Sequence, residues 1–489
     1  MKTKLMLASM LALVAGVTHA GWSIRESDVK GSNLEAMVRL HSGAVQVIAD
    51  KDWAATNFAS EKDVRAFQDL RYGMFICFGP STYVEKDLSW PVVEGKLPDR
   101  KGKFPYTFEE WTSWARQRLT FDKFSREELA RLFKASGMRY AVIVAKHHDG
   151  FHLWDTKLSD FKVTNTPYGK DYLREIIEAC RMAGVKVGIY YSQRDWYHPD
   201  YCPVDPETAV YAPGLPGRVK AKPGKTVRPG ARHKAYIDYQ FKAIEELCTN
   251  YGKIDIFWFD AVWSGGMFTP EMWDAERLTR RIRELQPGIV INNRASVPGD
   301  FDTPEQRIGM FQNRRAWETC MTLAEGWSYT GEKSKPRPPA DVFRKLQSCA
   351  MGDGNLLLSW GPRWDGSWPE NQAAVLTQVG DWLKVYGESL YGTRGGPWRP
   401  GAWGGATFKG NKAWLHVTRP PKDGAPVALP KLPGARLTAQ RVLSGEGLAL
   451  KETAQGYELS FGKASMDAPL ILELTFDRPL TQADVVPAK

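Results

Sequence analysis

Hydrophobic residues along this chain alternate between short continuous runs and longer stretches with helical spacing. A short apolar run predicts a buried parallel strand, because such a strand is covered on both faces. The predicted strands are 72–78, 140–146, 186–192, 254–260, 289–293, a short one near 327–329, and 355–360. The predicted helices are 126–136, 171–184, 232–250, 270–286 and 340–351.

This repeated alternation of strand and helix predicts a (β/α) barrel. The stretch 171–184 shows the helical pattern well: four apolar residues follow the i, i+3, i+4, i+7 spacing, and Gly184 suits the position after the last helical turn. A doubly wound open sheet is the alternative, but no GxGxxG motif follows the first predicted strand. We therefore expect an α/β fold, an irregular (β/α)8-like TIM barrel over residues 21–394.

The pattern changes after Arg394. Glycine and proline gather between 395 and 405, and short alternating segments follow at 413–418, 436–443, 456–461 and 470–476. Turn residues separate these segments, as expected for a β-sandwich over residues 395–489. Long loops at 92–107 and 199–231 follow strand ends, and we expect them at the rim of the barrel's active-site face.

The first twenty residues have the features of a signal peptide. Lys2 and Lys4 precede an apolar run, and Thr18-His19-Ala20 resembles a cleavage site. The run is too short to span a bilayer. The sequence therefore predicts export to the periplasm or the medium, with cleavage near Ala20 and no membrane association.

Composition narrows the function only slightly. The chain has 489 residues and a net charge of +10. The basic residues are scattered, apart from a cluster between Arg218 and Lys234, and no nucleic-acid-binding motif is present. Its 19 Trp, 18 Tyr and 21 Phe suit either a large core or the binding of sugar rings. The six cysteines show no CxxC pair and no zinc-ligand spacing, so buried thiols are expected although export permits disulfides.

Polar side chains stand at the carboxyl ends of several predicted strands, where barrel enzymes carry their chemistry. Asp260 ends one strand, with Trp258 two residues earlier on the same face. His147 and His148 follow another strand, Tyr191 lies at the end of a third, and Arg294 follows a fourth. Capping of the next helix is the alternative role for Asp260, and a structural, backbone-bonded histidine is the alternative for the pair. Neutral histidines that bind sugar hydroxyls fit better than metal ligands, because no further ligand motif accompanies them.

Hydrolysis of a glycosidic bond needs two carboxyl groups, one to attack or to activate water and one to protonate the leaving oxygen. Asp260 is the candidate nucleophile. The acid/base candidates that follow it in the chain are Asp300, Asp302, Glu305 and Glu318.

Six motifs together resemble the α-L-fucosidases of glycoside hydrolase family 29. They are KHHDGF (146–151), GIYYSQRDW (188–196), IDIFWFDA (254–261), VINNR (290–294), WETC with GWSY (317–329) and GDGNLLLSWGP (352–362). The resemblance implies a barrel followed by a β-sandwich and a retaining mechanism without metal or other cofactor. It implies Asp260 as nucleophile, Glu305 as first-choice acid/base and Glu318 as second. For sugar binding it implies His147, His148, Tyr191, Trp258, Arg294 and Trp327.

The chain departs from the family pattern in two places. Cys77-Phe78 stands where the family has His-Trp, and the nearest match to the family's Glu-Trp-Tyr is Ser113-Trp114-Ala115, with Glu110-Trp111 as a shifted alternative. Phe78 and Trp114 are thus expected at the pocket. A lost hydrogen bond to substrate costs about 1 kcal/mol.

We therefore expect an exported retaining exo-glycosidase that removes terminal α-L-fucose from oligosaccharides or glycoconjugates. Three alternatives stay open: the same mechanism on a related or substituted sugar such as L-galactose, a catalytically inactive fucose-binding relative, and a metal-dependent hydrolase built on His147 and His148.

Overall fold

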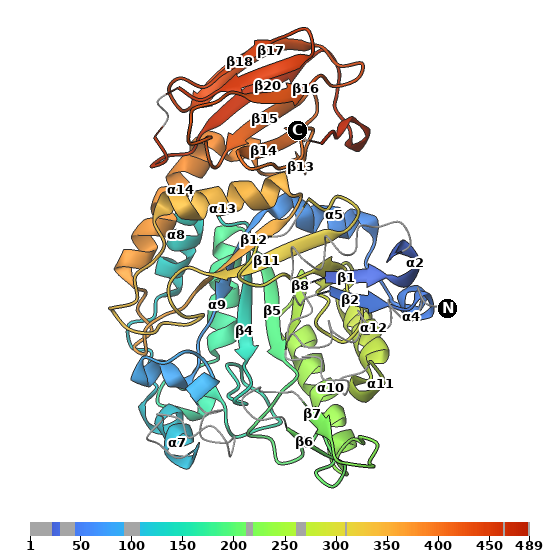
Figure 1. Ribbon diagram of the computed structural model, residues 1–489. Coiled ribbons are helices and arrows are strands. Elements are labelled where there is room, and N and C mark those ends of the chain that lie inside the picture. Colours follow the sequence, from blue (N-terminus) through green and yellow to red (C-terminus); the bar gives the residue numbers. More distant parts are fainter. Residues whose placement is uncertain are drawn as a thin grey trace.

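A computed structural model describes residues 22–29, 45–91, 108–211, 219–260, 270–308, 311–462 and 465–487 (Figure 1). The predicted signal peptide and the loop at 92–107 lie outside the described residues, as does part of the loop at 199–231. At the N-terminal end, β1 (Trp22–Arg25) pairs in parallel with β2 (Val45–Ile48), next to the short helices α2 (Glu26–Val29) and α4 (Asp50–Ala55).

Eight parallel strands form the central sheet, in the order β10-β11-β12-β3-β4-β5-β8-β9. A bridge between Asn292 and Phe301 joins the two edges, so the sheet is a nearly closed barrel. The strands are β3 (Tyr72–Ile76), β4 (Tyr140–Lys146), β5 (Lys186–Ser192), β8 (Ile256–Asp260), β9 (Val290–Ile291), β10 (Phe301–Asp302), β11 (Ala316–Thr322) and β12 (Asn355–Trp360). The predicted barrel is confirmed.

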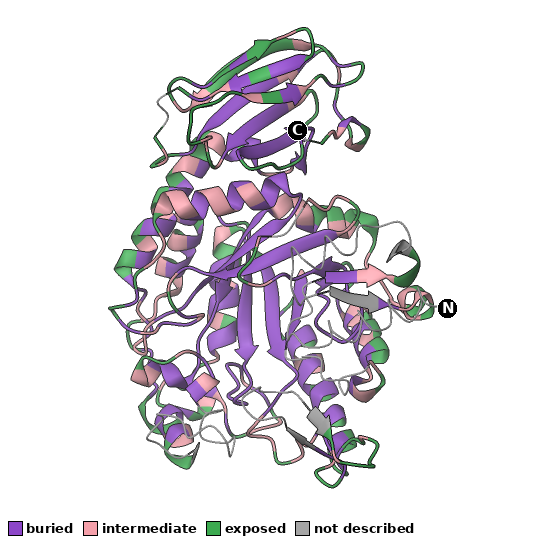
Figure 2. Ribbon diagram, in the orientation of Figure 1, coloured by how far each residue is buried: buried purple, intermediate pink, exposed green. Residues whose placement is uncertain are grey.

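Helices cover the outside of the barrel and bury their apolar faces against it (Figure 2). They are α5 (Glu61–Leu70), α7 (Phe108–Arg118), α8 (Arg126–Ser136), α9 (Tyr172–Ala183), α10 (His233–Thr249), α11 (Pro270–Trp273), α12 (Ala275–Leu285), α13 (Pro339–Met351) and α14 (Glu370–Tyr386). Helix α9 begins where Asp171 accepts a hydrogen bond from the backbone of Arg174 and ends at Gly184, which has a φ of 71°. Short 3-10 turns lie at Pro80–Val84, Val163–Asn165, Gly387–Ser389 and Gln482–Asp484.

The strand predicted near 327–329 is wrong. The barrel instead uses β10 and β11, and residues 327–329 lie on the loop after β11. The sequence of β11, Ala-Trp-Glu-Thr-Cys-Met-Thr, carries a charge and two hydroxyls on buried positions, so it does not read as an apolar run. Its Glu318 is tolerated because two side chains donate hydrogen bonds to it, as described below.

Two antiparallel sheets follow the barrel and enclose their own hydrophobic core. One has the order β13-β14-β15-β20-β17 and the other β16-β19-β18. Their strands are β13 (Arg394–Gly395), β14 (Gly404–Lys409), β15 (Lys412–Val417), β16 (Val427–Pro430), β17 (Leu437–Ser444), β18 (Ala449–Glu452), β19 (Gly456–Ser460) and β20 (Ile471–Phe476). The expected C-terminal β-structure is thus present, and β14 lies against α13 of the barrel (Figure 1).

A small hairpin of β6 (Ala209–Tyr211) and β7 (Val219–Ala221) projects from the segment between β5 and α10. Among the described helices, none has the length and apolar character needed to cross a membrane. All six cysteines are free thiols in the described part of the chain, and five of them, all except Cys202, are buried.

Candidate active site

The barrel places two residues of β8 on its inner face, Trp258 and Asp260, because side chains two apart on a strand point the same way. The register pairs Tyr190 of β5 with Trp258, and Ser192 with Asp260. Tyr190 and Trp258 consequently stack inside the barrel, with ring centroids 5.6 Å apart. Asp260 lies one layer above them, at the carboxyl end of its strand.

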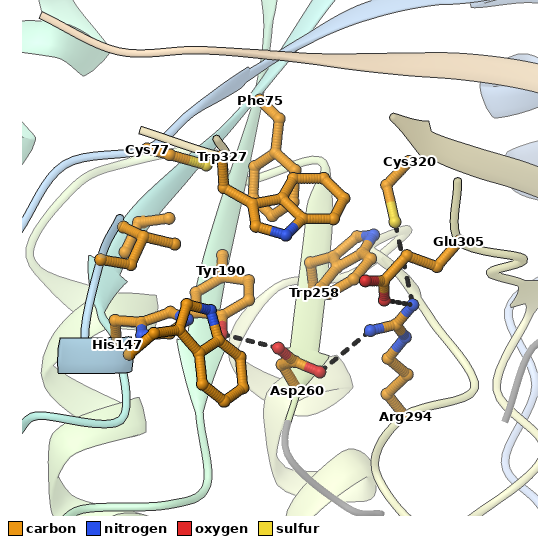
Figure 3. Close-up of a pocket in the computed structure, with 13 residues that line it drawn as sticks. Phe75, Cys77, His147, Tyr190, Trp258, Asp260, Arg294, Glu305, Cys320 and Trp327 are labelled. Atoms are coloured by element: carbon orange, nitrogen blue, oxygen red, sulfur yellow. Dashed lines mark hydrogen bonds and ion pairs between the residues drawn. The ribbon is translucent and has the colours of Figure 1, made fainter. Parts of the chain in front are cut away.

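A pocket opens at this end of the barrel (Figure 3). The space between its lining residues, including the part open to solvent, is about 420 Å³. It is lined by Phe75, Cys77, Leu88, Trp90, Val144, His147, Tyr190, Trp258, Asp260, Arg294, Glu305, Cys320 and Trp327. Polar groups gather around Asp260, whereas Phe75, Cys77 and Trp327 lie on the opposite side (Figure 3).

Both carboxylate oxygens of Asp260 receive a hydrogen bond. The hydroxyl of Tyr190 donates to Oδ2 at 2.8 Å, and the guanidinium of Arg294 donates to Oδ1 at 3.0 Å. Asp260 is only 8% exposed. A buried carboxylate held by a cation and a phenol keeps its charge and its orientation, which is what a nucleophile at a strand end needs.

Arg294 joins the two carboxylates of the pocket. Its second terminal nitrogen donates to Glu305 Oε2 at 3.0 Å, and its Nε donates to the hydroxyl of Thr303 at 2.9 Å. The guanidinium also lies 4.6 Å from the ring of Trp258. Burial alone lowers the pKa of Arg294, but the neighbouring charges of Asp260 and Glu305 outweigh it and hold the pKa above its usual value. One cation therefore fixes both carboxylates.

The two adjacent histidines after β4 are held by serine hydroxyls. His147 Nδ1 lies 2.6 Å from Ser89 Oγ, and His148 Nδ1 lies 2.7 Å from Ser192 Oγ. Burial lowers the pKa of His147 to about 3, although the charge of Asp260 opposes this shift. His147 is thus a neutral ring at ordinary pH. It lines the pocket, and the ring of His148 lies 3.8 Å from it.

The structure brings together six of the predicted site residues in one pocket: His147, Trp258, Asp260, Arg294, Glu305 and Trp327. The other five predicted residues do not line this pocket. They are His148, whose ring lies 3.8 Å from that of His147, and Phe78, Trp114, Tyr191 and Glu318.

Tyr191 and Phe78 face away from the pocket, because neighbouring side chains along an extended segment point in opposite directions. Tyr191 points outward from β5 and packs beneath the ammonium group of Lys146, at 4.8 Å. Phe78 also faces the helices and contacts the ring of Phe121 at 4.7 Å. Their neighbours in sequence, Tyr190 and Cys77, are the ones that line the pocket.

Trp114 lies on α7 and packs on Tyr83, with centroids 5.6 Å apart, away from the pocket. The additional pocket tryptophan is Trp90, in the segment that follows β3. Trp90 and Leu88 were not predicted at the pocket, because their segment shows neither a strand nor a helix pattern in the sequence. Its Ser-Trp-Pro sequence after the first strand was the available signal.

Glu318 is fully buried on β11, below Trp258. It accepts hydrogen bonds from Trp258 Nε1 at 2.9 Å and from the hydroxyl of Tyr140 at 2.6 Å. Glu318, the second choice for the acid/base, does not line the pocket. Asp300 and Asp302 are likewise structural: Arg283 donates to the first at 2.7 Å and Arg315 to the second at 2.9 Å.

Glu318 is expected to make folding stability depend on pH. Burial raises its pKa to about 7, against hydrogen bonds that lower it. The folded state therefore binds this proton more tightly than the unfolded state does. The stability gained from this tighter binding is fully present below about pH 4.5 and is lost as the pH rises through about 7. In the wild-type chain this loss in the free energy of unfolding is on the order of 3 kcal/mol. We expect Glu318→Gln to remove it, because the amide does not ionise. Urea unfolding at pH 5 and pH 8 checks this: parallel losses in both proteins contradict it.

The position of Tyr190 gives a second prediction. We expect Tyr190→Phe to lower kcat/KM by about 10-fold or more, because a hydrogen bond to an ionised partner is worth about 1.5–3 kcal/mol. Tyr191→Phe is the matched control and should change kcat/KM by less than about threefold, since it lies outside the pocket. A larger effect at Tyr191 than at Tyr190 in steady-state assays contradicts this assignment.

One side-chain atom each from His147, His148 and Asp260 lies within 4.8 Å of the others, close enough to consider a metal ion. Arg294 and Tyr190 already bind the two oxygens of Asp260, and the guanidinium repels a cation there. The pocket is therefore better suited to a neutral hydroxylated ligand than to a metal ion.

A near-closed barrel with two carboxylates at the carboxyl ends of its strands defines the class of protein: a glycoside hydrolase of the (β/α) barrel type. The α-L-fucosidase family model matches residues 40–388. The chain belongs to this family, glycoside hydrolase family 29, and is an α-L-fucosidase by family.

Relatives of known name agree. The α-L-fucosidase of Dictyostelium discoideum is 24% identical over 361 residues, 68% of this chain and 72% of the relative. Human plasma α-L-fucosidase is 25% identical, over 68% of this chain and 70% of the relative. Among solved structures, α-L-fucosidase isoenzyme 1 from Paenibacillus thiaminolyticus is 31% identical and has a TM-score of 0.70, covering 85% of this chain and 99% of its own.

Proposed function

We propose that this chain hydrolyses terminal α-L-fucosyl linkages with retention of configuration, with Asp260 as nucleophile and Glu305 as acid/base. The observation that carries the proposal is the guanidinium of Arg294, which contacts Asp260 and Glu305 at 3.0 Å each. One guanidinium bridging two carboxylates keeps them close together. Retaining enzymes need a short separation of about 5–5.5 Å, whereas inverting enzymes leave room for a water molecule.

In the first step, Asp260 attacks the anomeric carbon and Glu305 gives its proton to the leaving oxygen. The Tyr190 hydroxyl and Arg294 hold the attacking carboxylate in place. In the second step, Glu305 takes a proton from water, which attacks the glycosyl-enzyme and releases the sugar. Asp260 leaves as the carboxylate that its two partners stabilise.

The sugar lies between the polar and apolar sides of the pocket in this proposal. His147 and Arg294 bind hydroxyls, His148 supports the ring of His147, and the faces of Trp90, Trp258 and Trp327 pack on the C–H surface of the sugar. The substrates are fucosylated oligosaccharides or glycoconjugates, and the enzyme acts after export. A covalent intermediate has been trapped with a 2-fluoro-fucosyl fluoride in a related Bacteroides thetaiotaomicron α-L-fucosidase, of 24% identity and a TM-score of 0.72.

A second candidate function is the same reaction on a related or substituted sugar. Cys77 lines the pocket, and burial raises the pKa of its thiol well above the usual value, so it stays a neutral, weak hydrogen-bond donor. Together with Phe75 and Leu88 it gives one side of the pocket an apolar character. That side suits the methyl group of fucose or another apolar substituent in its place.

The test is release of 4-nitrophenol from 4-nitrophenyl α-L-fucoside by the mature chain, with and without exhaustive chelation of metals. We expect turnover that chelation leaves unchanged. The β-L-galactoside and α-L-galactoside serve as comparison substrates. Faster turnover of an α-L-galactoside supports the second candidate, and loss of activity on chelation overturns the metal-free mechanism.

A further inference from the structure

Ser89, on the loop after β3, links two polar side chains at the edge of the pocket. Its hydroxyl oxygen lies 2.6 Å from His147 Nδ1 and 2.7 Å from Asp149 Oδ2, and it accepts a hydrogen bond from the backbone N–H of Asp149 at 3.0 Å. Ser89 is fully buried, and His147 and Asp149 are 5% and 1% exposed. The three residues form one chain of hydrogen bonds that ends in the pocket.

The protons of this chain can be assigned by counting donors. The other oxygen of Asp149, Oδ1, accepts from the backbone of Phe151 at 2.8 Å, so the carboxyl group is anchored at both ends. Burial raises the pKa of Asp149 to about 6, so at pH 8 it is an ionised group that only accepts. The single proton of the Ser89 hydroxyl must then point at Asp149. Since Ser89 has no second proton, His147 Nδ1 must carry the hydrogen of that contact.

We propose that Asp149 and Ser89 are positioning residues that hold His147 as the Nδ1–H tautomer, which makes Nε2 a hydrogen-bond acceptor in the pocket. The inference rests on the proposed function in one respect, that His147 contacts the sugar. The hydroxyl beside His147 must then donate its proton. A substituent that only accepts, such as fluorine or a methyl ether, loses this contact, so the pocket discriminates against modification at that one hydroxyl.

The neighbouring His148 provides an internal control of the same kind. Its Nδ1 lies 2.7 Å from Ser192 Oγ, and the Ser192 hydroxyl donates to the carbonyl of Arg194 at 3.1 Å while accepting from the Arg194 N–H at 3.1 Å. The same count assigns the Nδ1–H tautomer to His148. Each histidine thus depends on a different serine.

The direct test is ¹⁵N NMR of histidine-labelled protein at pH 8, because the shifts of the two ring nitrogens report which one carries the proton. We expect the Nδ1–H pattern for His147 and His148 in the wild-type chain. Ser89→Ala should change only His147, Ser192→Ala should change only His148, and Ser89→Thr should preserve the wild-type pattern. An Nε2–H pattern for His147 in the wild-type chain, or an unchanged His147 in Ser89→Ala, overturns the proposal.

Calorimetric binding of L-fucose analogues tests the consequence for specificity. The analogues carry hydrogen or fluorine in place of one hydroxyl at C2, C3 or C4. At the position that contacts His147, we expect both to bind about tenfold more weakly than L-fucose, with fluorine no better than hydrogen. Fluorine better than hydrogen at all three positions contradicts the acceptor role. If L-fucose itself does not bind, the proposed function fails while the NMR result still decides the tautomer.

Discussion

Replacement of Asp260 by Asn is expected to lower kcat by about 10⁴-fold or more and leave the fold intact. The amide cannot form the glycosyl-enzyme, and effects of this size accompany loss of a nucleophile. Folding should survive because the amide oxygen still accepts from Arg294, whose other partner, Glu305, is unchanged. Steady-state assays on an aryl fucoside, with circular dichroism on the same samples, measure both expectations.

Asp302→Asn is the matched control, since Asp302 is also a buried carboxylate paired with an arginine but lies outside the pocket. We expect it to affect stability more than turnover. Asp260→Gly adds a positive test, because the space left by the side chain admits azide, which should restore turnover and give a fucosyl azide of inverted configuration. Turnover of Asp260→Asn within tenfold of wild type removes Asp260 from the nucleophile role.

Replacement of Glu305 by Gln has the second-largest expected effect, a loss of about 10²–10⁴-fold that depends on the leaving group. A nitrophenolate leaves without protonation, so its first step should be spared while water attack becomes slow. The expected result is a burst of nitrophenol followed by a slow steady state. Substrates with an alkyl or sugar leaving group should lose activity in both steps and show no burst.

Glu325→Gln is the control for this substitution, because Glu325 is an exposed glutamate on the loop that precedes Trp327. It should behave as wild type with every substrate. An equal loss for aryl and alkyl leaving groups in Glu305→Gln contradicts the acid/base assignment.

The barrel could be predicted from the sequence because its main strands are continuous apolar runs. β4, β5 and β12 begin and end at the predicted residues. β10 and β11 could not be predicted in this way, since β10 spans only two residues and β11 buries the polar side chain of Glu318. The stability of that buried carboxyl depends on Tyr140 and Trp258, which lie on two other strands, and no local pattern shows such a contact.

The candidate site could be predicted where strand ends carry it, at Asp260, Arg294 and His147. Tyr191 and Phe78 were expected at the pocket from their motifs, but their side chains face away from it because neighbouring side chains alternate in direction. Pairing the strands in register with Trp258 assigns Tyr190 to the inner face.

The loop after β3 is different. Ser89 and Trp90 reach the pocket through tertiary contacts with the residues that follow β4. The spacing of these residues along the sequence does not predict these tertiary contacts.

The most direct measurement of the central claim is mass spectrometry of the protein after incubation with 2-fluoro-α-L-fucosyl fluoride, a reagent that slows release of a covalent glycosyl-enzyme. We predict one added 2-fluorofucosyl group, located by peptide sequencing on Asp260. A label on any other carboxylate, or a product of inverted configuration with no label at all, would contradict the account.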